Sequence, residues 1–279
     1  MTLNFIWKKL CSYEMKNEII VKDIKVHYQD LCQCSSPKDT LVFLHGWGGT
    51  SSSWEKNITS LSRLYRCISV DFPGFGISDT PSSCWGVPEY TLFVRDFLNA
   101  LFVEKCTLVG KSFGGRVAIL FAFTYPSLLN KLILVAAAGV EGRSIFVESR
   151  IKFFSLGRDL IERLFSGYSS KVLNFFYRIF GINKEANPYK SLIKNAVVSL
   201  DLSWYARNIN IPTLIIWGSN DQVLPLRVGQ KLNRLIRGSV LNVIHDATHN
   251  VAEEKFVEVN SVITNFCHET YKVTNNSSS

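Results

Sequence analysis

The chain has 279 residues, of which 47% are hydrophobic and 19% are charged, and its formal net charge is +8. This composition is typical of a globular protein and excludes an intrinsically disordered chain, and the length suffices for one large α/β domain with an insertion. The longest apolar runs, such as residues 132–140, fall short of the roughly 20 residues that a membrane helix needs. The first ten residues also lack the order of a secretory signal, so we expect a cytoplasmic protein.

The cysteines and the charge distribution exclude further classes. Seven cysteines are scattered along the chain, which favours reduced thiols, and no second pair or histidine cluster joins Cys32 and Cys34 in a metal site. Between residues 143 and 194, ten basic side chains outnumber four acidic ones. We interpret this block as a solvated basic face, with weak contact to an anionic membrane surface as the alternative. Nucleic-acid binding has no supporting motif.

The predicted elements alternate along the chain. Residues 1–17 form an N-terminal extension, and residues 19–28 alternate with period two, as expected for one or two edge strands. Buried strands are expected from residue 40 and within residues 67–76, 106–110, 132–138, 213–218 and 239–244. Helices are expected at residues 51–64, 90–101 and 113–125, after Pro225, and at residues 252–267. The tail, residues 269–279, is disordered in composition.

One segment interrupts this alternation. Residues 140–207 show apolar side chains at helical spacing and no buried-strand pattern, so they are predicted to be a helical insertion. The insertion divides an α/β core made of residues 18–139 and 208–268. Strand–helix alternation predicts a mostly parallel, doubly wound sheet, in which ligands bind at the carboxyl ends of the strands.

The stretch LVGKSFGGR, residues 108–116, allows two interpretations. A phosphate-binding loop would require a glycine five residues before Gly110, where the chain has Lys105 followed by strand residues. The alternative is a nucleophile elbow, in which Gly110 and Gly114 flank Ser112 in a tight turn between a strand and a helix. The spacing favours the elbow.

A nucleophilic serine needs a base and an orienting acid. Among five histidines, His249 lies between the last predicted strand and the last helix, whereas His27 and His268 are expected at the surface. His245 is the second candidate for the base and is expected to be structural. Asp221 directly follows a buried strand and is the candidate acid. Asp246 is so close to His249 in sequence that we expect it only to shape the local turn.

Five landmarks resemble those of the α/β-hydrolase superfamily, specifically its capped members. They are HGWGG at 45–49, DFPGFGISD at 71–79, GKSFGG at 110–115, GSNDQVLP at 218–225 and ATHNVAEE at 247–254. The order Ser112, Asp221, His249 is the one that this fold uses. The resemblance implies an eight-stranded, mostly parallel sheet flanked by helices, with the insertion serving as a helical cap after strand 6. It also implies oxyanion-hole N–H groups on Trp47 and Phe113.

The resemblance further implies a function. We expect a serine hydrolase of small, largely apolar esters or related acyl substrates, a carboxylesterase in the first instance, that uses neither cofactor nor metal and acts as a monomer or homodimer. A cofactor-free carbon–carbon bond hydrolase of the diketo-acid type and a non-catalytic ligand receptor are the alternatives. Serine at position 112 argues against the epoxide-hydrolase and dehalogenase branches, which need aspartate there. The predicted substrate pocket draws on four cap aromatics, Phe146, Phe154, Phe175 and Phe176.

The chain departs from relatives at two positions. The residue before the nucleophile is often histidine in this superfamily, and here it is Lys111. Because neighbouring residues on an elbow point apart, we expect no role for Lys111 in catalysis. The carbon–carbon hydrolases usually carry tryptophan directly after the base, where this chain has Asn250, and this difference favours ester hydrolysis.

Overall fold

The computed structural model describes residues 17–140 and 200–268, which form an eight-stranded sheet in the order β1-β2-β4-β3-β5-β6-β7-β8. The strands are β1 (Asn17–Val21), β2 (Ile24–Leu31), β3 (Thr40–Leu44), β4 (Arg66–Val70), β5 (Cys106–Lys111), β6 (Leu129–Val135), β7 (Thr213–Gly218) and β8 (Val240–Ile244). β2 runs antiparallel to both β1 and β4, and every other pair is parallel. The predicted fold class is therefore confirmed.

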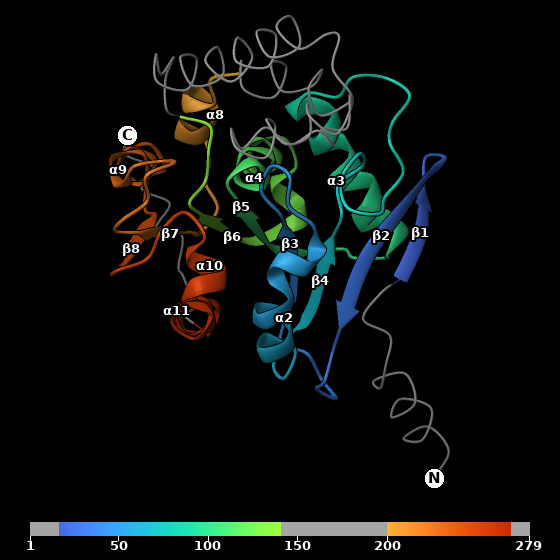
Figure 1. The fold of residues 1–279 in the computed structure, drawn as a ribbon, viewed down its shortest axis with the longest axis horizontal. Coiled ribbons are helices and arrows are strands. Elements are labelled where there is room, and N and C mark those ends of the chain that lie inside the picture. Colours follow the sequence, from blue (N-terminus) through green and yellow to red (C-terminus); the bar gives the residue numbers. More distant parts are fainter. Residues whose placement is uncertain (1–16, 141–199, 269–279) are drawn as a thin grey trace, which may run out of the picture.

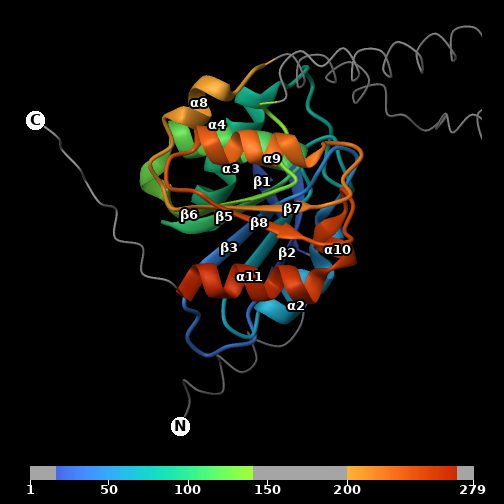
Figure 2. The ribbon, with the colours of Figure 1, turned by 90° about the vertical axis from the view of Figure 1, so that its left-hand side faces the viewer.

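Helices cover both faces of the sheet, as Figure 2 shows with the sheet seen nearly edge-on. One layer holds α3 (Val87–Ala100), α4 (Phe113–Thr124), α8 (Ser203–Arg207) and α9 (Leu226–Leu235). The opposite layer holds η1 (Ser51–Trp54), α2 (Glu55–Leu61), α10 (Val251–Glu254) and α11 (Phe256–His268). A short 3₁₀ turn, η2 (Pro126–Leu128), leads from α4 into β6. Strands enclosed in this way read as continuous apolar runs, which is the pattern seen in the sequence.

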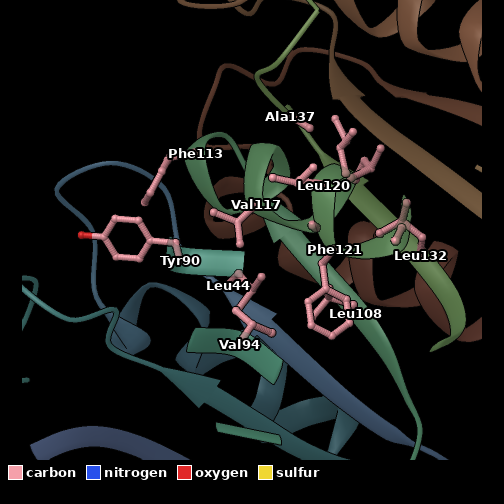
Figure 3. Close-up of a cluster of buried hydrophobic side chains, with 14 of the residues drawn as sticks. Leu44, Tyr90, Val94, Leu108, Phe113, Val117, Leu120, Phe121, Leu132 and Ala137 are labelled. Carbon is pink, nitrogen blue, oxygen red and sulfur yellow. The ribbon is translucent and has the colours of Figure 1, made fainter. Parts of the chain in front are cut away.

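Each helix layer closes a separate hydrophobic core. In the larger core, α4 lies against the middle of the sheet, with Val117 and Phe121 beside Leu44 and Leu108 (Figure 3). All four side chains are fully buried, and burial of one such side chain contributes about 1.5–3 kcal/mol. α4 is therefore held firmly on the strands, which fixes the position of its first turn.

The sheet order brings the motifs together at one edge. From β3 the chain first passes to β4 on one side and then crosses to β5 on the other, so β3 and β5 are neighbours. Such a reversal in strand order opens a crevice at the carboxyl ends of the strands. In Figure 1 the loop that follows β3 lies beside α4, which follows β5, and the Gly114 N–H joins the two by donating to the His45 carbonyl oxygen.

The first hairpin contains one edge strand, β1, as the pattern allowed, but the predicted surface position of His27 is wrong. β2 is not an edge strand, because β4 pairs with its other side, and His27 is correspondingly buried rather than at the surface. His27 donates its backbone N–H to the Ser78 hydroxyl in the loop after β4. Alternation with period two indicates that one face of a strand is covered, but it does not reveal whether both edges are paired.

The remaining element predictions differ from the structure mainly at their boundaries. The helix expected at residues 51–64 is divided into η1 and α2, and the closing helix is divided into α10 and α11. No helix in the described ranges combines the length and apolarity required to cross a membrane. The predicted extension, cap and tail lie largely outside the described residues. The last residues of the predicted cap form α8, where Tyr205 packs edge-on against Phe123 of α4.

Candidate active site

Ser112 occupies a strained turn between β5 and α4. Its φ of 52° and ψ of −110° lie where a residue with a Cβ is rarely found. The turn is tight because a Cβ added to Gly110 would lie 2.5 Å from the Gly114 carbonyl oxygen, and one added to Gly114 would lie 2.4 Å from that of Leu44. Glycine at both positions therefore permits β5, β3 and α4 to approach closely, and the turn presents the Ser112 hydroxyl at the sheet edge.

The glycine-rich turn after β3 lies directly beside the elbow. The Gly114 N–H donates to the His45 carbonyl oxygen over 3.1 Å. The buried His45 ring organises the turn, since its Nδ1–H donates to the Gly46 carbonyl at 2.7 Å and its Nε2 accepts the Phe72 N–H at 3.0 Å. These bonds hold residues 45–47 within reach of Ser112.

The two backbone donors predicted for the oxyanion hole have no protein acceptor among the described residues. They are the N–H of Trp47, in the turn, and the N–H of Phe113, the first residue of α4. The Trp47 and Phe113 rings pack edge-on at 5.6 Å, which ties the two segments together. Backbone N–H groups that lie beside a nucleophile and have no protein acceptor can donate hydrogen bonds to a developing oxyanion.

Asp221 and His249 complete a chain of hydrogen bonds to Ser112. The His249 Nδ1 lies 2.7 Å from Asp221 Oδ2, and its Nε2 lies 3.0 Å from Ser112 Oγ. The other oxygen of the buried Asp221 carboxylate accepts the N–H groups of Val223 at 2.9 Å and Leu224 at 2.8 Å. The carboxylate can accept a hydrogen bond only from a protonated Nδ1, so Nε2 is free to take the serine proton.

The turn that carries His249 is fixed to the end of β7. Gly218 lies so close to it that an added Cβ would be 2.4 Å from the Ala247 and Thr248 carbonyl oxygens. Within the turn, the Glu254 carboxylate accepts both the N–H and the hydroxyl of Thr248. These bonds lower the pKa of Glu254. The Glu254 side chain is exposed and closes this turn.

Lys111 contacts the segment that follows His249. Its ammonium lies 2.7 Å from Glu253 Oε1 and donates to Asn250 Oδ1 at 3.0 Å. The sequence contains no signal for this contact, because Lys111 and Glu253 are 142 positions apart. The structure thus assigns the unexplained elbow lysine a partner on α10.

An open groove of about 390 Å³ contains the Ser112 and His249 side chains. The turn from Gly46 to Gly49 lines this groove, and so do Asn250 and Glu253. A second hollow of about 490 Å³ lies at the start of β3 and β4, beside Thr40 and Arg66. That hollow is at the amino ends of the strands and is therefore remote from the Ser112 hydroxyl. The smaller groove is the candidate site.

The other predicted residues divide into two groups. Phe146, Phe154, Phe175 and Phe176 lie outside the described residues. His245 and His268 are exposed and take no part in the Ser112 chain of bonds. Among the residues that the structure describes, no cluster of three His, Cys, Asp or Glu side chains could hold a metal.

Comparisons with known proteins identify the family. A family model described as alpha/beta hydrolase fold matches residues 39–156. A 2-hydroxy-6-oxononadienedioate/2-hydroxy-6-oxononatrienedioate hydrolase from Paraburkholderia phymatum is 32% identical over 232 residues, covering 75% of this chain and 79% of that protein. The chain belongs to the α/β-hydrolase family.

Solved structures share the fold of this α/β hydrolase. A bacterial membrane phospholipase A superposes with a TM-score of 0.75 at 21% identity, covering 95% of this chain and 89% of that one. A meta-cleavage product hydrolase from Pseudomonas fluorescens IP01 superposes with a TM-score of 0.71 at 23% identity, covering 90% of this chain and 96% of that one. At these identities the likeness extends to the fold alone.

Proposed function

We propose that this α/β hydrolase is a serine hydrolase that cleaves a carboxylic ester or related acyl bond of a small molecule. One observation carries the proposal: Asp221, His249 and Ser112 form an unbroken chain of hydrogen bonds of 2.7 and 3.0 Å. A serine hydroxyl in hydrogen-bond contact with an imidazole, itself oriented by a buried carboxylate, is the arrangement that activates serine for acyl transfer.

In the proposed reaction, Ser112 Oγ attacks the substrate carbonyl carbon while His249 Nε2 accepts the hydroxyl proton. Collapse of the tetrahedral intermediate breaks the bond to the leaving group, which receives that proton as it departs. A water molecule then attacks the acyl-serine, with His249 again taking and returning the proton, and the carboxylic acid is released. Asp221 stabilises the imidazolium in both steps and remains ionised.

The backbone N–H groups of Trp47 and Phe113 are the proposed donors to the oxyanion. Removal of one such donor in comparable sites costs about 3 kcal/mol of transition-state stabilisation. The groove that leads to Ser112 has apolar walls at Trp47 and Val223 and a polar wall at Asn250 and Glu253. A small substrate with one polar end suits these walls, and the four cap phenylalanines remain the proposed site for its apolar part.

Carbon–carbon bond hydrolysis is the second candidate, and the names of relatives favour it. Besides the Paraburkholderia protein, a hydrolase of the same name from Klebsiella pneumoniae is 28% identical over 273 residues, covering 88% of this chain and 91% of that protein. Against this candidate, Asn250 follows the base in place of the usual tryptophan. A panel of aryl esters, thioesters, lactones and vinylogous diketo acids separates the two candidates by kcat/KM.

The test of the main proposal is Ser112→Ala. We expect wild type to hydrolyse a short-chain aryl ester and to be labelled by a fluorophosphonate, and we expect the variant to lose both. Turnover that survives in Ser112→Ala would refute the assignment of the nucleophile. A wild-type protein that binds the fluorophosphonate covalently but turns over no member of the panel would instead favour a non-catalytic receptor.

A further inference from the structure

Lys111 is a buried cation that the proposed reaction does not use. It ends β5, directly before Ser112, and only 7% of its side chain is exposed. A buried ammonium is costly unless it is paired and hydrogen-bonded. Lys111 meets both conditions through Glu253 Oε1 at 2.7 Å and Asn250 Oδ1 at 3.0 Å. Both partners belong to the segment that carries His249.

This segment is held at the end of β7 and by the buried side chains of Val251 and Ala252, but its own short helix does not join it to the nucleophile strand. α10 contains only four residues, from Val251 to Glu254, which is too short for a helix to be stable by its own hydrogen bonds. The contact between Thr248 and Glu254 closes the turn internally but does not attach it to the nucleophile strand. Lys111 makes that attachment, because one bond reaches the residue after His249 and the other reaches α10.

The geometry points to Lys111 as a positioning residue: we propose that its bonds to Asn250 and Glu253 hold His249 at proton-transfer distance from Ser112. This inference rests on the proposed serine-hydrolase function. Proton transfer is sensitive to such placement, since a displacement of about 1 Å can cost roughly a hundredfold in rate.

The two ends of the ion pair differ in burial, and this difference guides the choice of variant. The Glu253 side chain is 43% exposed, so solvent can satisfy its carboxylate when the lysine is removed. Loss of Glu253 would instead leave a buried ammonium unpaired. Lys111→Met, which replaces the cation with an apolar chain of similar length, is therefore the variant expected to fold normally.

The experiment measures kcat and KM for a short-chain aryl ester, the rate constant of fluorophosphonate labelling, and the thermal unfolding midpoint. We expect Lys111→Met to lower kcat by about 10- to 100-fold and the labelling rate by a similar factor, with KM changed by less than about twofold. Glu253→Gln, which keeps an acceptor oxygen without the charge, is expected to show a smaller loss. The double variant should lose no more kcat than Lys111→Met alone, because Lys111→Met already removes the contact with Glu253.

A matched control is Lys131→Met. Lys131 also donates through its ammonium, to the Phe266 and Cys267 carbonyl oxygens, but it lies near the start of β6 at the other end of the sheet. The kcat of the Lys131→Met variant is expected to equal that of wild type.

The outcomes are distinguishable. An unlabelled, inactive wild type refutes the proposed function, whereas an active wild type with kcat within twofold of Lys111→Met refutes the positioning role. A loss in Lys111→Met that Lys131→Met reproduces also refutes it. If Lys111→Met does not fold, an unchanged kcat in folded Glu253→Gln refutes the role, and a reduced kcat with unchanged KM supports it.

Discussion

Replacement of Asp221 by asparagine tests the orientation of His249 more sharply than its removal would. Oδ1 of Asp221 accepts two backbone N–H groups, from Val223 and Leu224. Only an oxygen can occupy that position, so the asparagine amide must place its NH₂ group where Oδ2 now meets His249. The NH₂ group donates to Nδ1, and Nε2 then carries the proton and can no longer accept one from Ser112.

The expected loss of kcat follows from this change of tautomer. In enzymes with the same relay, the wrong tautomer lowers kcat by about 10⁴-fold, which corresponds to roughly 5 kcal/mol of activation free energy. The fold should tolerate the change, because both bonds to Oδ1 remain and the third is reversed rather than lost. We expect the free energy of unfolding to fall by about 2 kcal/mol or less.

The assay compares kcat for an aryl ester with a denaturant unfolding curve on the same preparation. Asp246→Asn is the matched control: Asp246 is the acid nearest to His249 in sequence, it is exposed, and its positive φ of 52° suits asparagine. We expect the control to keep its kcat within about twofold, as surface substitutions usually do little. An Asp221→Asn variant with more than a tenth of wild-type kcat would refute the role assigned to Asp221.

Two further predictions concern stability. Gly114→Ala should lower the free energy of unfolding by at least about 2 kcal/mol, because its Cβ would lie 2.4 Å from the Leu44 carbonyl oxygen; a denaturant midpoint equal to that of wild type would contradict this. The hydrogen bonds from Thr248 hold the pKa of Glu254 below its usual value, so they stabilise the fold above pH 4.5 and are lost as the pH falls through the lowered pKa. Glu254→Gln should therefore be less stable than wild type at pH 7 and approach it at pH 3, and unfolding curves that keep a constant separation across this range would disprove the linkage.

Much of the architecture could be predicted because buried parallel strands leave an unambiguous pattern. Five continuous apolar runs followed by turn residues correspond to β3, β4, β5, β6 and β7. Once these strands are taken as parallel, the residues after β5, β7 and β8 must lie at one edge. The proximity of Ser112, Asp221 and His249 was predicted on this ground, and the distances of 2.7 and 3.0 Å in the structure show it.

The partners of Lys111 could not be predicted. Adjacency along a strand indicates that Lys111 and Ser112 point apart, but it does not reveal what Lys111 meets on its own side. That depends on how α10 is placed against β5, which is a property of packing and not of spacing. The burial of His27 was missed for a related reason: the sequence pattern of β2 does not show that β4 pairs with its second edge.

The bond from the Leu202 N–H to the Gly139 carbonyl oxygen has a consequence for how such a protein can diversify. The chain leaves the core at Gly139 and re-enters it beside the same residue at Leu202. For the core, the intervening segment is therefore an insertion whose two ends are already joined. The entropic cost of closing a loop rises only slowly with its length. That segment can therefore be lengthened, shortened or exchanged during evolution while the sheet and the hydrogen bonds among Ser112, His249 and Asp221 stay unchanged. The proposed cap could then change its substrate preference without any change in the proposed catalytic residues.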